Sequence, residues 1–426
     1  MQMKPEEILS DLIKIQSVNP PGGETAAALY LKKLCDAAKI PNEIIEPAPG
    51  RGSFIATLGA GKKSLLFLSH IDVVPATDGW AFPPFSGEIR EGFVYGRGAL
   101  DCKGLVAAEI HALLTLAQEG TLNGKLIFAA VADEEVGGYL GAGLLAQKYP
   151  EKIRADFAIN EGAEAPIMIK GKTCHFISVG EKAPSWLKIK TKGVAGHGSE
   201  PYLPNNAVVK MAKIVQGLAE YKPRIIIGPE ARYLLEEIAR MAGYKGSIDE
   251  TTLDKFFAKL DDPGLVSYLS AITRMTVSPN VIQGGVKTNI VPDSCTAEID
   301  IRILPGQDKQ YVMKELGLIF GDAEIETLQY GLPTISSGDT EYYKLIVETI
   351  KESLGDVPVL PTLCAGATDS RYLREMGIPA YGVGVMTYRL DAAMKASVHG
   401  KNEKLDIKSL QNKADFLVQL AGKYLS

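Results

Sequence analysis

Residues 126–138 read Leu-Ile-Phe-Ala-Ala-Val-Ala-Asp-Glu-Glu-Val-Gly-Gly. The apolar run 126–132 predicts a buried β-strand, and the glycine pair marks the turn that ends it. Between them stand Asp133, Glu134 and Glu135, where a strand of an α/β sheet opens onto a ligand site. An isolated Asp-Glu-Glu run is usually a solvated group of surface charges. Carboxylates directly after an apolar strand are poorly placed to serve only solubility. Two adjacent carboxylates there can divide labour, one binding a metal ion and the other moving protons.

Polar side chains follow two further apolar runs, and another carboxylate stands in a loop. The run 64–69 ends at His70 and Asp72, whose i, i+2 spacing at a strand terminus can direct both side chains into one cleft. Asp101 stands in a loop punctuated by glycines before a helical stretch, and Glu161 follows the strand-like run 156–160. Ligands of open α/β sheets bind outside the carboxyl ends of the strands. We therefore expect these groups to gather near the carboxylates at 133–135.

Helical and strand patterns alternate along the first part of the chain, which predicts an α/β fold with a mainly parallel sheet and helices on both faces. The expected helices cover residues 5–15, 25–38, 104–119 and 138–148, and the expected strands cover 53–58, 65–69 and 125–132.

The pattern changes after Val179 to that of a compact α+β unit. Its expected strands cover 185–190, 271–277, 297–304 and 323–329, with helices at 206–218 and 309–318 and a polar, helix-rich stretch at 229–259. A helix at 341–354 and a strand at 380–385 then resume the first pattern. We therefore expect residues 1–181 and 332–426 to form one domain, interrupted by an inserted domain at 182–331.

Composition narrows the class of protein. A chain of 426 residues exceeds what one hydrophobic core usually serves, so two or more domains are expected. The net charge of −5, with mixed signs, gives no basic footprint for nucleic acid. No run approaches the roughly 18 apolar residues that span a bilayer, and the acidic N-terminus lacks an apolar signal core, so we expect a cytoplasmic protein without a membrane partner. The five scattered cysteines lack CxxC spacing, which argues against a disulfide framework or a thiolate zinc site.

Five motifs occur in order along nearly the whole chain. They are Ser69-His70-Ile71-Asp72-Val73-Val74-Pro75, Gly96-Arg97-Gly98-Ala99-Leu100-Asp101-Cys102-Lys103-Gly104, Ala132-Asp133-Glu134-Glu135-Val136-Gly137, Asn160-Glu161-Gly162 and Val398-His399-Gly400-Lys401-Asn402-Glu403. Together they resemble the signature of the co-catalytic zinc amidohydrolases, the family of acetylornithine deacetylase, succinyl-diaminopimelate desuccinylase, aminoacylase and the glutamate carboxypeptidases. The resemblance implies a zinc-peptidase catalytic domain whose inserted α+β domain serves as a lid and dimerisation surface.

The resemblance also implies two divalent metal ions. Such a pair, ~3.5–4 Å apart, needs a bridging carboxylate, terminal imidazoles and carboxylates, and an open water position. Two histidines and three carboxylates suit Zn2+, with Co2+ or Mn2+ able to substitute. The implied ligands are Asp101 as the bridge, His70 and Glu161 on one ion, and Glu135 and His399 on the other.

Asp72 and Glu134 stand beside this ligand set. Asp72 would orient His70 through its other ring nitrogen, the usual role of a carboxylate next to a metal-bound imidazole. Glu134 would be the general base, because a carboxylate within reach of a metal-bridging water can take its proton and pass it to the leaving nitrogen. In relatives the peptide bond after the bridging aspartate is cis, which implies a cis bond between Asp101 and Cys102.

The predicted substrate contacts come mostly from the inserted region. The family's counterpart of His197 crosses a dimer interface and hydrogen-bonds the scissile carbonyl oxygen, which would make it an oxyanion donor. Asn289 and Arg302 resemble contacts to the substrate carboxylate, and Gly366 would offer backbone amides to the same group. A guanidinium suits this role because it binds carboxylate in a two-pronged fork. On the residues alone, His197 also fits a polar turn, and Arg302 also fits a strand arginine paired with Asp300.

These inferences predict a homodimeric, metal-dependent amidase for an N-acyl amino acid or a short peptide with a free carboxylate. Activity like that of acetylornithine deacetylase or succinyl-diaminopimelate desuccinylase is the first choice, and a dipeptidase or carboxypeptidase is the second. A non-catalytic binding protein with a relic site is disfavoured, because the base and every ligand are present. His111 and His175 match no motif and are expected to be structural, and Cys102 is not expected to bind metal.

Overall fold

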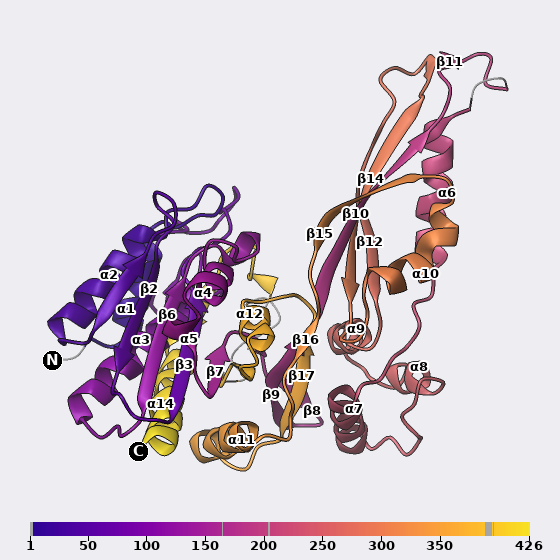
Figure 1. Cartoon of the computed structure of the whole chain (residues 1–426). Helices are drawn as coiled ribbons and strands as arrows, with labels where there is room; N and C mark the ends of the chain where they lie inside the picture. The colour runs from indigo at the N-terminus through magenta and orange to yellow at the C-terminus, as the bar shows by residue number, and fades with distance from the viewer. Residues whose placement is uncertain (1–2, 164, 203–204, 388–393, 395) are drawn as a thin grey trace. The chain divides into compact units, whose positions relative to one another are not determined.

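The computed structural model describes residues 3–163, 165–202, 205–387, 394 and 396–426. They divide into two compact units (Figure 1). Unit 1 contains Met1–Val179, Ser336–Thr362 and Thr368–Ser426, and unit 2 contains Gly180–Ile335 and Leu363–Ala367. The chain therefore leaves unit 1 to build unit 2 and returns, with the short segment Leu363–Ala367 belonging to unit 2.

The largest sheet has ten strands, most of them in unit 1, and runs in the order β1-β2-β6-β3-β7-β18-β9-β16, with β17 and β8 also paired to β9. Its centre, β6-β3-β7-β18, is parallel, and the flanking pairs are antiparallel, as predicted for a mainly parallel α/β sheet. The strands are β1 (Asn42–Ile45), β2 (Ser53–Leu58), β3 (Ser64–His70), β6 (Lys125–Val131), β7 (Phe157–Asn160), β8 (Ile167–Ile169), β9 (Lys172–Glu181), β16 (Thr334–Ile335), β17 (Val359–Cys364) and β18 (Ala380–Val383). A small second sheet joins β19 (Lys404–Asp406), β5 (Phe93–Tyr95) and β4 (Glu88–Arg90).

Helices cover both faces of the central sheet because its strands are apolar on both sides. On one face, Leu66 and Leu68 of β3 share a buried cluster with Leu145 of α4 and Leu373 of α12. On the other, Phe157 of β7 packs against aromatic rings of α11 and α14. The helices of unit 1 are α1 (Pro5–Lys14), α2 (Thr25–Ala37), α3 (Lys103–Glu119), α4 (Ala142–Lys148), α5 (Pro150–Ile153), α11 (Glu341–Leu354), α12 (Ser370–Glu375) and α14 (Ile407–Leu425).

The helix expected at 138–148 begins four residues later than predicted, at Ala142. Gly138 has a positive φ of 68°, which an α-helix does not allow. Gly141 packs so tightly that a Cβ there would lie 1.7 Å from the carbonyl oxygen of Ala132. The glycines therefore extend the turn after β6 and delay the helix.

Unit 2 contains an antiparallel sheet in the order β12-β14-β10-β15 and a two-stranded pair, β11 with β13. Its core lies between the sheet and helices α6 and α10, and includes Ile299, Ile301 and Ile303, the inward positions predicted from their alternation. The elements are β10 (Ala183–Lys192), β11 (Gly196–His197), α6 (Ala207–Glu220), α7 (Pro229–Ala242), α8 (Leu253–Phe257), α9 (Pro263–Ala271), β12 (Thr276–Gly284), β13 (Ile290–Val291), β14 (Ser294–Ile303), α10 (Lys309–Phe320) and β15 (Glu324–Tyr330).

The strand expected at 271–277 was misplaced. Ala271 is the last residue of α9, and the strand β12 runs from Thr276 to Gly284. Pro279 argues against a strand in the sequence, because proline has no N–H to donate to the hydrogen-bond ladder of a central strand. The structure accommodates it because β12 lies at the sheet edge and shifts register between Pro279 and Val281.

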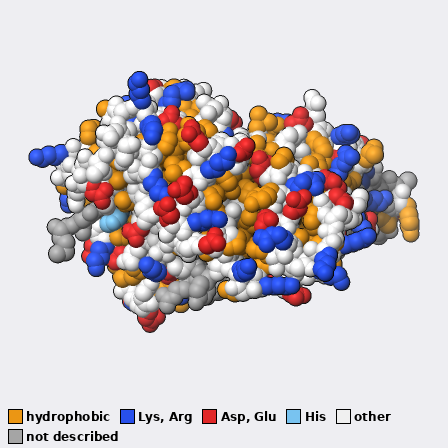
Figure 2. All heavy atoms as spheres, turned by 90° about the horizontal axis from the view of Figure 1, so that it is seen from below, with side chains coloured by type: hydrophobic (Ala, Val, Ile, Leu, Met, Phe, Trp, Pro, Cys, Tyr) orange, Lys and Arg blue, Asp and Glu red, His pale blue; other side chains and the backbone are white. Residues whose placement is uncertain are grey.

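Charged side chains of both signs are interspersed over the face shown in Figure 2, as expected from the composition. Among the described residues, no helix combines the length and the apolar character that crossing a membrane requires.

Candidate metal centre

Asp101 lies between two histidines that are far apart in the sequence. Its Oδ1 lies 3.0 Å from Nε2 of His70, and its Oδ2 lies 3.0 Å from Nε2 of His399. Each carboxylate oxygen therefore faces a different imidazole, as a carboxylate that bridges two ions must do.

The other two predicted ligands divide between these histidines. Oε2 of Glu161 lies 3.6 Å from Nε2 of His70, and Oε2 of Glu135 lies 3.1 Å from Nε2 of His399. Ligand atoms of His70, Asp101 and Glu135 all lie within 4.8 Å of one another. The structure thus brings together all five residues predicted to bind metal, in the two sets expected.

Parallel strand ends explain this convergence. His70 ends β3, Glu135 lies in the short helical turn Glu134–Val136 after β6, and Glu161 directly follows β7. These three strands are parallel neighbours, so their carboxyl ends meet at one edge of the sheet. Asp101 stands two residues before α3, and the Asp101–Cys102 peptide bond is cis, as predicted.

Asp72 connects the histidine to the acidic turn. Asp72 lies beside Nδ1 of His70, the ring nitrogen that faces away from Asp101, with its backbone carbonyl oxygen at 3.0 Å and its Oδ1 at 3.4 Å. It also accepts hydrogen bonds from the backbone amides of Glu134, at 3.2 Å, and Glu135, at 3.1 Å. Burial alone would raise the pKa of Asp72, but hydrogen bonds from His70 and Asn19 lower it. Asp72 is thus held as a carboxylate that orients both the imidazole and the turn.

Asp133, the first carboxylate of the run, has a different role from its neighbours. Its φ of 77° starts the turn, and its Oδ2 accepts a hydrogen bond from the amide of Leu140 at 2.9 Å. Its other oxygen pairs with Arg51. Asp133 therefore shapes the turn, and only Glu134 and Glu135 remain for chemistry.

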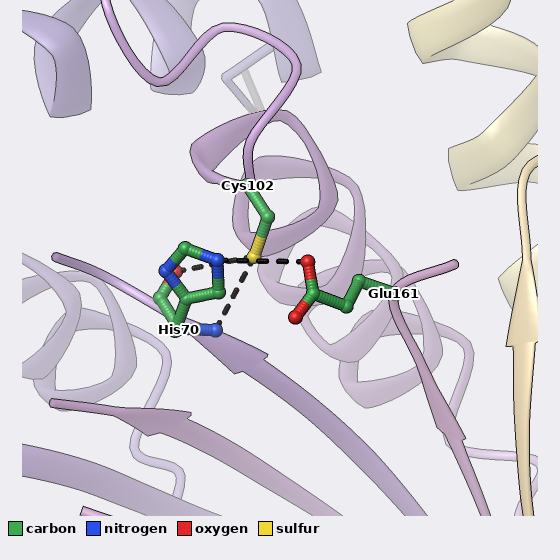
Figure 3. Close-up of side chains that lie close together, drawn as sticks. All are labelled: His70, Cys102 and Glu161. Atoms are coloured by element: carbon green, nitrogen blue, oxygen red, sulfur yellow. Dashed lines mark hydrogen bonds and ion pairs between the residues drawn. The ribbon is translucent and has the colours of Figure 1, made fainter. Parts of the chain in front are cut away.

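Cys102 lies beside His70 and Glu161 (Figure 3). Its thiol contacts the backbone of His70, with Sγ 3.3 Å from the amide nitrogen and 3.4 Å from the carbonyl oxygen. Burial raises the pKa of this thiol well above its ordinary value. Because metals bind the thiolate, these contacts support a packing role rather than a ligand role.

Glu403, the last residue of the motif 398–403, ties two loops of the site together. Its buried carboxylate accepts hydrogen bonds from the amides of Gly98, Leu100 and Asp101 at 2.9, 2.7 and 3.1 Å, and it pairs with Arg97 at 2.6 Å. Glu403 follows His399 by four residues, so one side chain ties the His399 loop to the Asp101 loop. Its burial is complete, at 0% exposure.

Glu403→Gln is expected to weaken metal binding by roughly 10–100-fold, the usual cost of losing a residue that orients metal ligands. Glutamine keeps one oxygen acceptor but loses the charge that pairs with Arg97. Competition with a chelator measures the affinity, and Glu352→Gln, which changes an exposed glutamate of α11 paired with Lys423, is the control. Unchanged affinity in Glu403→Gln would show that the loops hold their positions without it.

The donor set fits divalent cations. Burial and neighbouring negative charges raise the pKa of Glu134 well above its ordinary value, and burial also raises the pKa values of Glu135 and Glu161. A divalent cation would relieve this repulsion. Imidazole nitrogens with carboxylate oxygens are a donor set that zinc accepts.

Metal binding is expected to release protons. Hydrogen bonds to Asp101 and Glu135 raise the pKa of His399 to about 10, so this imidazole carries a proton at neutral pH until a cation replaces it. Apparent metal affinity should therefore rise with pH and fall on acidification. Calorimetric titrations of the metal-stripped protein in buffers of different ionisation enthalpy measure the proton count. Binding without proton release would contradict this charge assignment.

Comparison with known proteins agrees with this geometry. The model of peptidase family M20/M25/M40 matches residues 66–423. The chain belongs to this family. Aminoacylase-1 of Sus scrofa is 25% identical and aligns over 97% of this chain and 93% of its own length. The N-fatty-acyl-amino acid synthase/hydrolase PM20D1 of Mus musculus is 29% identical over 83% of this chain and 73% of its own length.

Solved structures share the fold. The M20 family metallo-carboxypeptidase Sso-CP2 of Sulfolobus solfataricus superposes with a TM-score of 0.78 over 99% of both chains, at 24% identity. The M20 family YXEP protein of Bacillus subtilis, described as a dinuclear metal binding peptidase, has a TM-score of 0.62 at 16% identity and covers 99% of this chain and 97% of its own. This M20 member is thus a metal-dependent amidohydrolase with an α/β catalytic fold.

The substrate residues predicted in unit 2 fall into two groups. His197 in β11 pairs with Ile290, and the amide of Gly198 donates to the carbonyl of Asn289 at 2.9 Å, so His197 and Asn289 lie together at an exposed tip. Nδ1 of His197 lies 2.7 Å from Oγ of Ser199. Arg302 lies near the far end of β14.

Arg302 forms the pair with Asp300 that its sequence position also allowed. Its Nε lies 2.8 Å from Oδ1 and its Nη2 lies 3.2 Å from Oδ2 of Asp300. Gly366 lies in the segment Leu363–Ala367, whose Cys364 carbonyl accepts from the amide of Lys182 at 3.0 Å. The Lys182 ammonium is itself buried and donates to the carbonyls of Ala271 and Arg274 at 2.9 and 3.0 Å, so it is held as a structural group.

His111 and His175 lie outside the metal cluster. Nδ1 of His111 lies 3.1 Å from the carbonyl oxygen of Met3, which places it in a contact between α3 and the N-terminal segment. Burial lowers the pKa of His175 to about 4, so it stays neutral in the interior.

Proposed function

We propose that this chain hydrolyses the amide bond of N-acyl amino acids with a free carboxylate. The observation that carries the proposal is the bridging position of Asp101, with one imidazole and one further carboxylate on each side. The proposed metal ligands are His70, Asp101, Glu135, Glu161 and His399. We infer Zn2+ from the donor set, with Co2+ or Mn2+ able to substitute.

Two bound ions would polarise the scissile carbonyl and lower the pKa of the attacking water. Glu134 takes the proton of that water at its carboxylate and passes it to the leaving nitrogen. Asp72 fixes the ring of His70 and the backbone from which Glu134 projects. A base beside a complete ligand set supports catalysis over a relic binding site.

The names of the relatives support an N-acyl amino acid as substrate. Aminoacylase-1 and an N-fatty-acyl-amino acid synthase/hydrolase both align over most of the chain. Arg302 and the amides around Gly366 are the proposed anchors for the free carboxylate. Activity like that of acetylornithine deacetylase or succinyl-diaminopimelate desuccinylase is one form of this reaction, and the acyl group distinguishes the forms.

A carboxypeptidase or dipeptidase is the second candidate. Sso-CP2 is a metallo-carboxypeptidase by its description, and a probable carboxypeptidase S-like protein of Dictyostelium discoideum is 28% identical over 85% of this chain and 72% of its own length. Peptides also present an amide bond near a free carboxylate, so the same anchors serve both substrate classes.

We further propose that the protein is a homodimer through unit 2. Strand β12 leaves one sheet edge without a described partner strand, and its Val281 and Ile282 are 38% and 53% exposed. Val209 of the neighbouring helix α6 is 52% exposed. An open strand edge beside apolar side chains suits a two-fold contact with a second copy.

The spacing of the predicted substrate residues also favours a dimer. The pair β11–β13 lies beyond one end of the sheet of unit 2 (Figure 1). Arg302 is the penultimate residue of β14, near the other end of that sheet. Residues 295–302 of an extended strand alone span roughly 23 Å. One chain therefore cannot place both His197 and Arg302 on one small substrate. In a dimer, one chain can supply His197 and the other Arg302.

Activity assays with the metal-loaded protein test the proposed function. The panel should contain N-acetyl, N-succinyl and N-long-chain-acyl amino acids, matched dipeptides, and the same compounds with an amidated carboxylate. We expect N-acyl amino acids to be hydrolysed fastest and amidation to abolish the preference. Faster cleavage of dipeptides would favour the second candidate. A cytoplasmic location stays a prediction from the sequence.

A further inference from the structure

The turn that carries Glu134 and Glu135 is held from both sides. On its N-terminal side, the amides of both residues donate to Asp72. On its C-terminal side, the carbonyl oxygen of Gly137 accepts two hydrogen bonds, from Nη2 of Arg371 and from the hydroxyl of Tyr372, each at 2.6 Å. Both donors come from α12, more than two hundred residues later in the chain.

The two glutamates of the turn are anchored unequally. The Glu135 carboxylate accepts from the amide of Val74 at 3.2 Å and lies 3.1 Å from His399. Within the described part of the chain, no hydrogen bond fixes the carboxylate of Glu134. The position of Glu134 therefore depends on the backbone of its turn, whereas Glu135 has side-chain contacts of its own.

Helix α12 packs closely against this turn. Leu373 is fully buried in the cluster under the central sheet, which fixes the helix. A Cβ at Gly138 would lie 2.3 Å from Oδ1 of Asp369, so the turn has no room for a side chain there. The guanidinium of Arg371 also lies over the ring of Tyr372, 4.7 Å from its centroid, so the two donors support each other.

We propose that Arg371 and Tyr372 are positioning residues that hold the Gly137 carbonyl and thereby place the Glu134 carboxylate for proton transfer. The inference rests on the proposed function of Glu134 as the base. Misplacing a catalytic group by about 1 Å can cost on the order of 10²-fold in rate. Because two donors share one acceptor, each can partly replace the other.

The test compares Arg371→Met, Tyr372→Phe and the double variant. Each single variant should lower kcat by less than about 10-fold, and the double variant by on the order of 10²-fold, more than the product of the single effects. KM and the content of two metal ions should stay unchanged, because Glu135 keeps its own contacts. Arg374→Met is the matched control, since Arg374 lies on the same helix and donates to the carbonyl of Ala380 at 2.9 Å instead of to the turn.

Hydrogen exchange gives a readout that does not depend on substrate choice. Amides of residues 135–140 should exchange faster in the double variant than in wild type or Arg374→Met, with the unfolding midpoint of the double variant matching that of the control. Unchanged exchange in the turn, an equal loss of kcat in Arg374→Met, or loss of metal in step with activity would overturn the inference. A wild-type protein that cleaves no amide in the panel would overturn the proposed function, and the exchange result would still decide whether α12 holds the turn.

Discussion

Glu134→Gln is expected to lower kcat by roughly 10²–10⁴-fold while the protein keeps both metal ions. Glutamine has nearly the shape of glutamate but cannot accept the proton of the attacking water. The ligands themselves are untouched, because Asp101, Glu135 and Glu161 supply the carboxylates that face the two histidines. KM should change little, since the base acts in the transition state.

The adjacent residue provides the matched control. Glu135→Gln removes one carboxylate of the same turn, but one that faces His399, and it should lower the metal content as well as activity. Elemental analysis together with steady-state kinetics separates the two roles. Loss of a metal equivalent in Glu134→Gln, or near-normal turnover, would remove Glu134 from the role of base.

The convergence of the proposed metal ligands could be predicted from the sequence because three of the five follow recognisable strands. His70, Glu135 and Glu161 each stand at the end of an apolar run, and parallel strands bring such ends to one edge. No described strand directly precedes His399, so only the motif 398–403 indicates it as a ligand. Its partner Glu403 lay in the same motif, but only the folded loops show that its carboxylate receives three amides.

Other parts depend on contacts that no local pattern encodes. The hydrogen bonds from Arg371 and Tyr372 to the carbonyl of Gly137 join segments that are distant in the chain. No sequence pattern around either residue predicts this contact. Asp133 looked equivalent to its two neighbours until its left-handed backbone and its contact with Arg51 separated it from them. In unit 2, Pro279 concealed the edge strand β12, because a tolerated proline and a strand-ending proline are indistinguishable in sequence.

His197→Ala is expected to lower kcat by roughly 10²–10³-fold with little change in metal content, the usual effect of removing an oxyanion donor. His197 lies at the exposed tip of unit 2, and Ser199 occupies its Nδ1 side, so its Nε2 is the nitrogen left to donate. Ser199→Ala is the control for the turn itself. A His197→Ala protein with full activity would return His197 to the role of a polar turn residue.

Mixing the two inactive variants tests whether the site is shared between subunits. If His197 of one chain serves the base of the other, a heterodimer of Glu134→Gln and His197→Ala contains one site with both groups intact and one with neither. Random exchange of equal amounts makes half of the dimers mixed, so activity should recover to about a quarter of the wild-type level per chain. The mixture of Glu134→Gln with the double variant Glu134→Gln/His197→Ala should recover nothing, because no chain then supplies a base. Absence of recovery after verified subunit exchange, or full activity in a monomer, would place all catalytic groups in one chain and exclude the shared site.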